Sequence, residues 1–343
     1  MSLPETTKAL VVKELGNKFR EVTEIRSLPM PKPQPGYAIV KNKIAGMNAS
    51  DIIFTSGGYD PTHKPPMTAG LEGLGEVVAV GDGVSLKVGQ CVVILHFGCF
   101  AEYVSAPADK LIPVPSLDPA LMSIVLSGLT ASISLEQEGD LKEGKKVLVT
   151  AAAGGTGQFA VQIAKMAGCH VIGTCSTQEK SDFLKSIGCD RVINYKKENV
   201  GDVLSKEYPG GVDVVYECIG KEMFDTCLQN LAVKGRLIVI GAISNYERQD
   251  LKDMSGMVSK VPIGMVCLRK SASVRGFFLP HYHSEFPRHI GLLMSQYTAG
   301  KLKVTQDNGK TVPTGPFKGL EKVADAHDYM YSGKNIGKVI VEI

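Results

Sequence analysis

The feature that most constrains this chain is a glycine-rich turn between an apolar strand and a helix. The sequence Ala151-Ala152-Ala153-Gly154-Gly155-Thr156-Gly157 follows the run Val147-Leu148-Val149 and precedes a helix-like run that begins at Gln158. Strand, turn and helix in this order are the context of the dinucleotide-binding fingerprint, although its first glycine is Ala152 here. Because glycines let backbone N–H groups approach a pyrophosphate at a helix N-terminus, the turn predicts a nucleotide site.

From about residue 127 the chain alternates strand-like and helix-like segments. Six apolar runs have the length of strands and lie at 146–150, 170–174, 191–195, 212–216, 236–240 and 273–278. Helix-period segments lie between the early ones, at 157–168, 179–188 and 223–231. This alternation is typical of a parallel, doubly wound α/β sheet with crossover helices. Six strands are the number that a full dinucleotide-binding Rossmann domain uses, and we place this domain at residues 127–278.

The segments on either side of this domain have a different pattern. Before it, short apolar runs are separated by Gly and Pro, which is typical of a β-rich, barrel-like domain. After it come two helix-like segments, 287–299 and 319–332, and a closing strand at 338–343. We expect this last part to return to the first domain, which then comprises residues 1–126 and 279–343.

Composition points to a protein that acts on small molecules. Lys and Arg number 38 against 35 Asp and Glu, and this balance does not suit a nucleic-acid surface. The eight cysteines include no C-x-x-C pair, which is typical of reduced, intracellular thiols. We expect a cytoplasmic protein without a membrane segment, because we find no signal sequence and no run of about 18 apolar residues. The final tripeptide Val341-Glu342-Ile343 is no peroxisomal signal, which leaves other import routes open.

The strand that follows the glycine turn bears on the choice of cofactor. An NAD site places Asp or Glu at the tip of this strand, where it binds the ribose 2′-hydroxyl. The tip here is Thr174-Cys175-Ser176-Thr177, without an acid. Ser176 can donate to a 2′-phosphate and Lys180 can pair with it, so we predict NADPH. Glu179 argues against this choice, and the alternative for Lys180 is an ordinary solvated lysine.

With these motifs in place, the chain resembles the medium-chain dehydrogenase/reductase superfamily, in its quinone oxidoreductase and prostaglandin reductase branch. The specific stretches are 145–162, 189–196, 234–241, 270–278 and 329–338. The resemblance implies a GroES-like catalytic domain beside the Rossmann domain. It also implies that Tyr195 lies at the 2′-phosphate and Thr130 lies against the nicotinamide. Further residues that it places around the nicotinamide are Gly241, Ile243, Phe277, Phe278, Leu279 and Asn335. Tyr195 could instead cap a strand, and Phe277 could be a core residue.

The same resemblance allows a test for zinc. Zinc-dependent members of the superfamily hold the catalytic ion with a Cys, a His and a third Cys or acid. The corresponding places read Asn48, Leu71 and Leu126 in this chain, and none of these offers a thiolate or an imidazole. A four-cysteine lobe for a structural zinc is also missing, because only His96-Phe97-Gly98-Cys99 separates two strands there. We therefore expect a metal-free protein.

Without a Lewis acid, reduction of an activated C=C bond is easier than reduction of an isolated carbonyl. We therefore predict a reductase of α,β-unsaturated ketones, and the resemblance implies 15-oxo-prostaglandins as substrates. Asn48, Tyr59 and Tyr246 are the candidate catalytic hydrogen-bond donors, although Asn48 could merely bind backbone. Met254, Met257 and Met265 could line an apolar wall for a lipid-like substrate or be ordinary helix packing.

Three alternatives remain open at this point. One is an NADPH:quinone oxidoreductase, and another is a non-catalytic NADPH-binding protein. A zinc alcohol dehydrogenase would require about one zinc ion per chain. The resemblance also implies that the strand at 273–278 pairs across a dimer axis, which predicts a homodimer.

Overall fold

The computed structural model describes residues 3–59, 62, 64–246 and 259–343 and divides into two compact units. The first unit contains residues up to Leu126, Tyr246, and the chain from Gln306 onward. The second contains residues 127–245 and, among the described residues that follow, 259–305. The return to the first unit thus comes later than the expected position 279. The reason is that α11 (Phe286–Thr298) packs against α4 (Leu129–Ser134) of the second unit.

The second unit is built on one parallel sheet of six strands, as predicted. The strands are β9 (Lys146–Val149), β10 (His170–Cys175), β11 (Arg191–Asn194), β12 (Val212–Glu217), β13 (Leu231–Val239) and β14 (Ser273–Gly276). Their order in space is β11-β10-β9-β12-β13-β14, with every neighbouring pair parallel. The strand order reverses between β9 and β12, and in open α/β sheets ligands bind outside the carboxyl ends of the strands at such a point.

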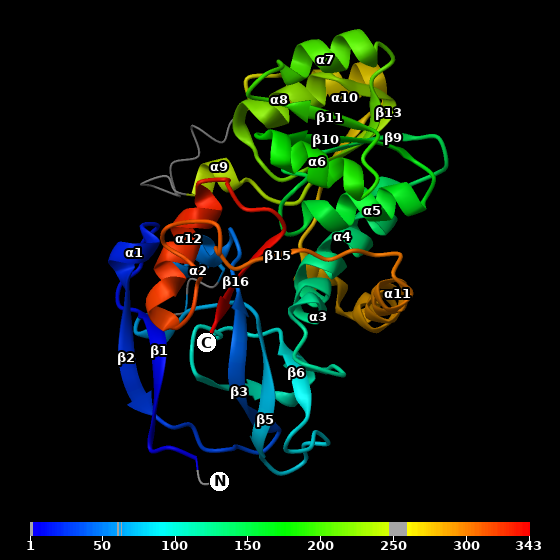
Figure 1. Ribbon diagram of the computed structural model, residues 1–343. Helices are drawn as coiled ribbons and strands as arrows, with labels where there is room; N and C mark the ends of the chain where they lie inside the picture. The colour runs from blue at the N-terminus through cyan, green and yellow to red at the C-terminus, as the bar shows by residue number, and fades with distance from the viewer. Residues whose placement is uncertain (1–2, 60–61, 63, 247–258) are drawn as a thin grey trace. The chain divides into compact units, whose positions relative to one another are not determined.

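Helices cover both faces of this sheet (Figure 1). Helices α5 (Gly157–Met166) and α6 (Gln178–Ser186) lie on one face. On the other face lie α7 (Val200–Glu207), α8 (Lys221–Gln229) and α10 (Ile263–Lys270). The apolar core under this second group includes Leu148 and Val215 of the central strands and Leu204 of α7. Helices α5, α7 and α8 are amphipathic, with their apolar residues turned toward the sheet, which is how such helices are held in place.

Helix α5 begins so close to the strand-turn junction that its first residue must lack a side chain. A Cβ atom at Gly157 would lie 2.4 Å from the backbone oxygen of Ala151 and 2.7 Å from that of Ala152. A similar constraint operates between strands, because a Cβ at Gly173 of β10 would lie 3.0 Å from the Cβ of Ala152. Small residues therefore allow the turn to fit between two strands and a helix.

The first unit is β-rich, as expected. Strands β1 (Thr6–Val12), β2 (Thr23–Pro29) and β4 (Met67–Thr68) form a small sheet in the order β2-β1-β4. The larger sheet has the order β15-β16-β3-β5-β6-β8, and β7 pairs with β3 off this path. Its strands are β3 (Tyr37–Gly46), β5 (Gly73–Val80), β6 (Cys91–Ile94), β7 (Tyr103–Pro107), β8 (Leu111–Pro113), β15 (Gln306–Asp307) and β16 (Lys338–Glu342).

Strand β16 completes the first unit late in the sequence. It pairs antiparallel with β3, so that Val341 lies opposite Ala45. Helix α12 (Val323–Tyr331) packs its buried residues, among them Val323 and Ala326, into the same core. Two short helices, α1 (Phe19–Val22) and α2 (Asp51–Thr55), also contribute to this core, through Phe19 and Ile52.

One helical run is long and apolar enough to raise the question of a membrane. It spans Pro119–Gly139 and contains α3 (Pro119–Ser123), η2 (Ile124–Gly128), α4 and η3 (Leu135–Gly139). Within its most apolar window, 78% is buried inside the protein. A core helix passes the same length and composition test, so this run does not by itself indicate a membrane segment.

The close approach at Gly157 can be tested with Gly157→Ala. Alanine normally favours a helix over glycine, but here its Cβ collides with backbone, so we expect a loss of about 1–3 kcal/mol in the free energy of unfolding. Gly210→Ala is the matched control, because a Cβ at Gly210 meets nothing within 4 Å. Thermal and urea unfolding measure both variants. An unchanged stability of Gly157→Ala would refute the packing argument.

Candidate functional site

The glycine turn is braced by Thr174 of β10. Its hydroxyl oxygen accepts the N–H of Ala151 at 3.2 Å, and its carbonyl accepts the N–H of Ala152 at 3.2 Å. Ala151 has a φ of +47°, a conformation rare for residues with a side chain, and this bracing offsets its cost. The N–H groups of Gln158, Phe159 and Ala160 bond to the carbonyls of Gly154 and Thr156, so the N–H groups of Gly155 to Gly157 are the ones that would face an anion such as a pyrophosphate.

Two residues that the sequence did not point to lie at the carboxyl ends of β9 and β12. Thr150 directly follows β9, and its hydroxyl oxygen accepts the N–H of Cys218 at 2.8 Å. Glu217 ends β12, is fully buried, and accepts the N–H groups of Ile219 at 2.8 Å and of Gly220 at 3.0 Å. Burial raises the pKa of Glu217. The sequence held a signal for these hydrogen bonds, namely an acidic residue at the end of a buried strand with a glycine soon after it.

The residues predicted for a 2′-phosphate lie at the ends of neighbouring strands. Cys175 of β10 pairs with Asn194 of β11, which places Ser176 and Tyr195 side by side where the two strands end. Lys180 lies in the first turn of α6, where its N–H donates to the hydroxyl of Thr177 at 3.2 Å. Its side chain is only 8% exposed, so it is no ordinary solvated lysine. Glu179, in contrast, is exposed.

The residues predicted around the nicotinamide are placed less uniformly. Phe277 is 9% exposed and stacks on Tyr282 with ring centroids 4.8 Å apart, which fits the core role left open for it. Phe278 is exposed, and Leu279 is buried at the start of η5 (Leu279–Glu285). Thr130 lies on α4 in the same unit.

Gly241 and Ile243, which are also predicted to lie at the nicotinamide ring, come shortly after the end of β13. Asn335 belongs to the first unit, where its amide donates to the Gly337 carbonyl at 2.9 Å. The role of each of these residues toward the cofactor stays a prediction.

In the first unit, Asn48 lies in a buried polar network. Its side-chain N–H groups face the carboxylate of Glu72 at 3.0 Å and the carbonyl of Gly46 at 3.3 Å. Its side-chain oxygen accepts from the ammonium group of Lys338 at 2.7 Å. The amide is thus fully engaged inside the protein. This geometry favours the alternative that Asn48 has a structural role over direct donation to a substrate.

The network centres on an ion pair that is shut off from solvent. Lys338 pairs directly with the carboxylate of Glu72, and the two side chains are 3% and 0% exposed. Glu72 follows Leu71, and Leu71 packs against the apolar core of this unit. A buried charge is costly unless it is paired, so Lys338 and Glu72 depend on each other. Of the three places predicted to lack zinc ligands, Asn48 thus belongs to this network and Leu71 precedes its glutamate.

Asp51, Tyr59 and Tyr246 lie close to this network. The Asp51 carboxylate accepts the Asn48 backbone N–H at 2.8 Å, and burial raises the pKa of Asp51 to about 8. Burial also raises the pKa of Tyr59 to about 12, with the charges of Asp51 and Tyr246 acting in the same direction. Tyr59 and Tyr246 both pack against the apolar core of the first unit. The structure thus places both tyrosines on this core, and its raised pKa keeps Tyr59 protonated at neutral pH.

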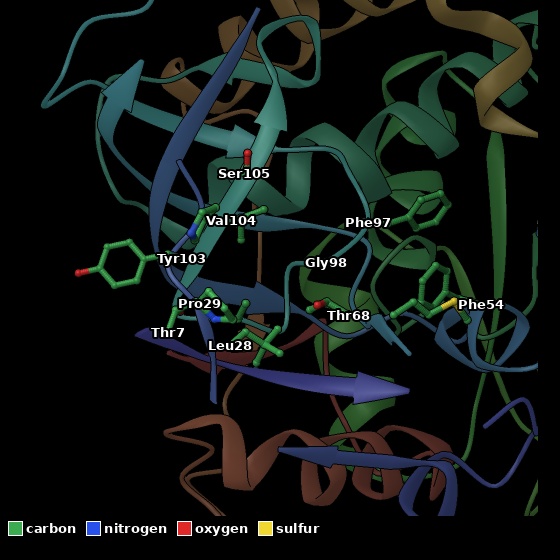
Figure 2. Close-up of a pocket in the computed structure, with 14 residues that line it drawn as sticks. Thr7, Leu28, Pro29, Phe54, Thr68, Phe97, Gly98, Tyr103, Val104 and Ser105 are labelled. Carbon is green, nitrogen blue, oxygen red and sulfur yellow. The ribbon is translucent and has the colours of Figure 1, made fainter. Parts of the chain in front are cut away.

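A hollow of about 340 Å³ opens within the first unit and is lined in part by Phe54 and Phe97 (Figure 2). Phe97 lies in its wall, stacks on Phe54 with centroids 4.8 Å apart, and lies 6.0 Å from the ring of Tyr59. The remaining lining residues extend along β1, β2 and β7 as far as Tyr103 and Ser105. None of the predicted cofactor residues lines this hollow.

Of the three methionines predicted to line an apolar wall, Met265 lies among the described residues. Met254 and Met257 lie outside the described residues. Met265 lies on α10 and is 45% exposed, and α10 has no buried residue among those described. This helix therefore does not use Met265 for core packing.

Two family models match the chain. Residues 34–116 match the alcohol dehydrogenase GroES-like domain, and residues 155–295 match the zinc-binding dehydrogenase model. Among curated proteins, prostaglandin reductase-3 of Mus musculus is 52% identical over all of this chain and 91% of its own length. A probable quinone oxidoreductase of Leishmania amazonensis is 46% identical, with both chains covered completely.

Solved structures of oxidoreductases resemble this chain over nearly its whole length. A mycobacterial protein complexed with NADPH superposes with a TM-score of 0.83 at 29% identity, covering 98% of this chain and all of its own. Quinone oxidoreductase of Escherichia coli, also complexed with NADPH, has a TM-score of 0.82 at 26% identity over the same shares.

The buried carboxyl of Asp51 makes a prediction about pH. The unfolded carboxyl titrates near pH 4, whereas the folded one holds its proton up to about pH 8. Between these values the folded state binds more protons, so its stability falls as the pH rises. Asp51→Asn should remove part of this fall, and the exposed control Asp82→Asn should not. Urea unfolding at pH 5 and pH 8 measures the effect, and parallel losses in wild type and Asp51→Asn would contradict it.

Proposed function

Because the chain belongs to the medium-chain dehydrogenase/reductase superfamily, in its quinone oxidoreductase and prostaglandin reductase branch, we propose a zinc-independent, NADPH-dependent enone reductase. Its reaction is the reduction of the C=C bond of α,β-unsaturated ketones, with 15-oxo-prostaglandins as the leading substrates. The observation that carries the proposal is the network at Asn48, in which the charge of Lys338 is paired with Glu72.

The cofactor residues fit NADPH. The turn before α5 offers backbone donors to the pyrophosphate, and Gly157 has no room for a side chain. Ser176, Lys180 and Tyr195 would hold the 2′-phosphate, and no acid stands at the end of β10 to compete with it. When bound, NADPH supplies the hydride that adds to the β-carbon of the enone.

The proposal of zinc independence rests on side-chain chemistry. Asn48, Leu71 and Leu126 offer neither a thiolate nor an imidazole, and the amide of Asn48 is already engaged by Lys338 and Glu72. Carbonyl reduction needs strong stabilisation of a developing alkoxide. Addition to an activated C=C bond spreads the charge over an enolate, so it depends more on orientation and exclusion of water.

The enolate must then receive a proton at its α-carbon. Tyr59 and Tyr246 are the candidate donors, and with its raised pKa Tyr59 keeps its proton at neutral pH. The O–H bond of the tyrosine would break as the new C–H bond forms, and water would return a proton to the phenolate. Asn48, engaged in its network, would position this part of the site instead of donating to the substrate.

A quinone reductase is the alternative enzyme, supported by the relative in Leishmania amazonensis. A non-catalytic NADPH-binding protein is the alternative from another class. We also infer a homodimer, because β14 lies at the edge of the six-stranded sheet and no strand among the described residues pairs with its outer side.

Initial rates with NADPH and NADH on 15-oxo-prostaglandin E2, a 2-alkenal and a quinone test the proposed function. We expect fastest NADPH oxidation with the prostaglandin enone, unchanged after treatment with a chelator. A faster quinone reaction would favour the alternative enzyme. Tight NADPH binding without turnover on the whole panel would favour the non-catalytic protein. Loss of activity with the chelator would overturn zinc independence.

Lys180→Met tests the choice of NADPH. Loss of a cation at the 2′-phosphate should raise the KM for NADPH by about tenfold or more and leave the KM for NADH nearly unchanged. Lys185→Met is the matched control, since Lys185 lies on the same helix but is exposed. Equal effects of Lys180→Met on both cofactors would exclude a 2′-phosphate contact.

A further inference from the structure

Glu217 is a fully buried acid without a basic partner among the residues that the structure describes. Its carboxylate oxygens accept the N–H groups of Ile219 and Gly220 and, at 3.4 Å, the hydroxyl group of Thr150. All three donors are neutral. Hydrogen bonds accepted at both oxygens favour the ionised carboxylate, against the burial that raises its pKa. Glu217 thus holds a negative charge that no cation of the described chain neutralises.

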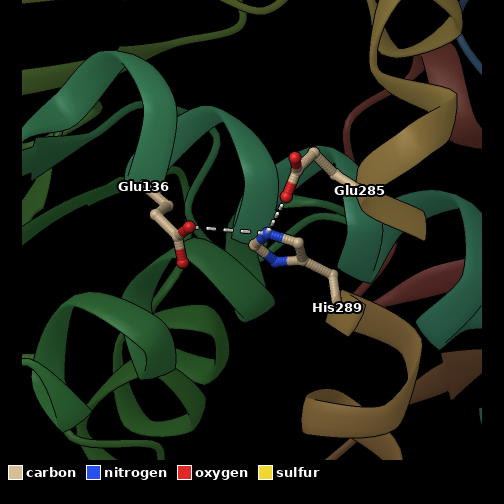
Figure 3. Close-up of side chains that lie close together, drawn as sticks. All are labelled: Glu136, Glu285 and His289. Atoms are coloured by element: carbon tan, nitrogen blue, oxygen red, sulfur yellow. Dashed lines mark ion pairs between the residues drawn. The ribbon is translucent and has the colours of Figure 1, made fainter. Parts of the chain in front are cut away.

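Other acids of the second unit have basic partners. Glu136 and Glu285 both lie close to His289, and both bond to the guanidinium of Arg288 (Figure 3). These two acids are also partly exposed, at 46% and 30%. A buried charge without a partner is costly to fold. Because groups whose pKa is perturbed by burial are concentrated at functional sites, Glu217 is a candidate for a role beyond folding.

Glu217 lies where a dinucleotide should cross the sheet. Tyr216 of β12 pairs with Val149 of β9, so Glu217 and Thr150 are the next residues on the two strands. Thr150 directly precedes the glycine turn predicted for the pyrophosphate. The strand order reverses between β9 and β12, which is where such sheets bind ligands. A dinucleotide held by the turn would therefore cross the carboxyl end of β12.

The loop that Glu217 braces also holds part of the segment predicted for the nicotinamide. Its carbonyl groups at Cys218 and Ile219 accept the N–H groups of Ile243 and Ser244, both at 3.1 Å. The charge of Glu217 acts on this loop as well. Burial, and next this charge, raise the pKa of the half-buried Cys218 thiol. The field of Glu217 therefore reaches beyond its own hydrogen bonds.

We propose that Glu217 is a specificity residue that favours the oxidised, positively charged nicotinamide over the reduced, neutral one. The pyrophosphate and the 2′-phosphate are the same in NADP⁺ and NADPH, so a fixed carboxylate distinguishes the two forms by the charge of the ring. Attraction between opposite charges is stronger in a buried setting than in water. Because hydride donation leaves a positive ring, Glu217 would also favour hydride transfer from NADPH. This last consequence alone rests on the proposed function.

Equilibrium binding of NADPH and NADP⁺ to the full chain, without a substrate, tests this proposal. The fluorescence of NADPH reports its own binding, and competition reports that of NADP⁺. Glu217→Gln removes the charge and keeps the shape, so the ratio of the Kd for NADP⁺ to the Kd for NADPH should rise by about fivefold or more. Glu217→Asp keeps the charge and should leave the ratio nearly unchanged, even where both forms bind more weakly. Glu222→Gln, an exposed acid on α8, should leave both constants unchanged.

A second pair of variants keeps Glu217 and its hydrogen bonds in place. Cys218→Lys adds a cation beside Glu217 that can neutralise it, and Cys218→Met is the matched control with an unbranched, uncharged side chain. The ratio of the two constants should be higher in Cys218→Lys than in Cys218→Met. This comparison decides the question even where Glu217→Gln does not fold.

A purely structural brace predicts a different result, in which Glu217→Gln weakens both forms of the cofactor equally. That result would overturn the proposal. So would equal changes of the ratio in Glu217→Gln and Glu217→Asp, or equal ratios in Cys218→Lys and Cys218→Met. Because these constants are measured without turnover, they do not depend on whether the chain reduces enones.

Discussion

The first unit depends on a charge pair that it cannot expose. Lys338 and Glu72 are both sealed from solvent, and each would be a costly isolated charge without the other. The pair joins β16 to the chain just before β5, and Asn48 completes it from the end of β3. Asp51 and Tyr59 follow on the next segment, where burial keeps both groups protonated at neutral pH. Asp51 and Tyr59 can keep their protons here because the positive charge of Lys338 is already paired with Glu72.

Much of the second unit could be predicted from the sequence because its signals are local. Strand, glycine turn and helix follow one another within about twenty residues, and the missing acid after Thr174 is read directly from the sequence. The first unit gave weaker signals. Strand β2 alternates partly buried and exposed positions after Thr23 and has no continuous apolar run, so its pairing with β1 holds it in place.

The errors and gaps concern contacts between residues far apart in sequence. The return at Gln306 rather than 279 follows from the packing of α11 on α4, which no local pattern records. The side-chain oxygen of Asn48 is engaged by a hydrogen bond from Lys338, which lies at the far end of the chain. The brace formed by Glu217 could be suspected from its position but not its hydrogen bonds. Local patterns therefore predicted the strand, turn and helix better than the contacts of Asn48.

The two units use basic side chains in contrasting ways. Lys338 is 3% exposed and cannot leave without stranding Glu72, so it is a permanent part of the fold. Arg288 is half exposed, and its guanidinium bonds Glu136, Glu285 and His289 on the second unit. An exposed ion pair of this kind contributes less to stability than a buried pair, in which the loss of one partner leaves the other as an uncompensated charge.

The distance along the chain between Glu72 and Lys338 has a consequence for biosynthesis. A ribosome makes Glu72 early and must complete the whole second unit before Lys338 emerges. Until then, the nascent first unit holds an acid whose partner does not yet exist, and β3 lacks a neighbouring strand. Such an unfinished sheet exposes an edge that can pair wrongly, so chaperones should bind this chain for most of its synthesis.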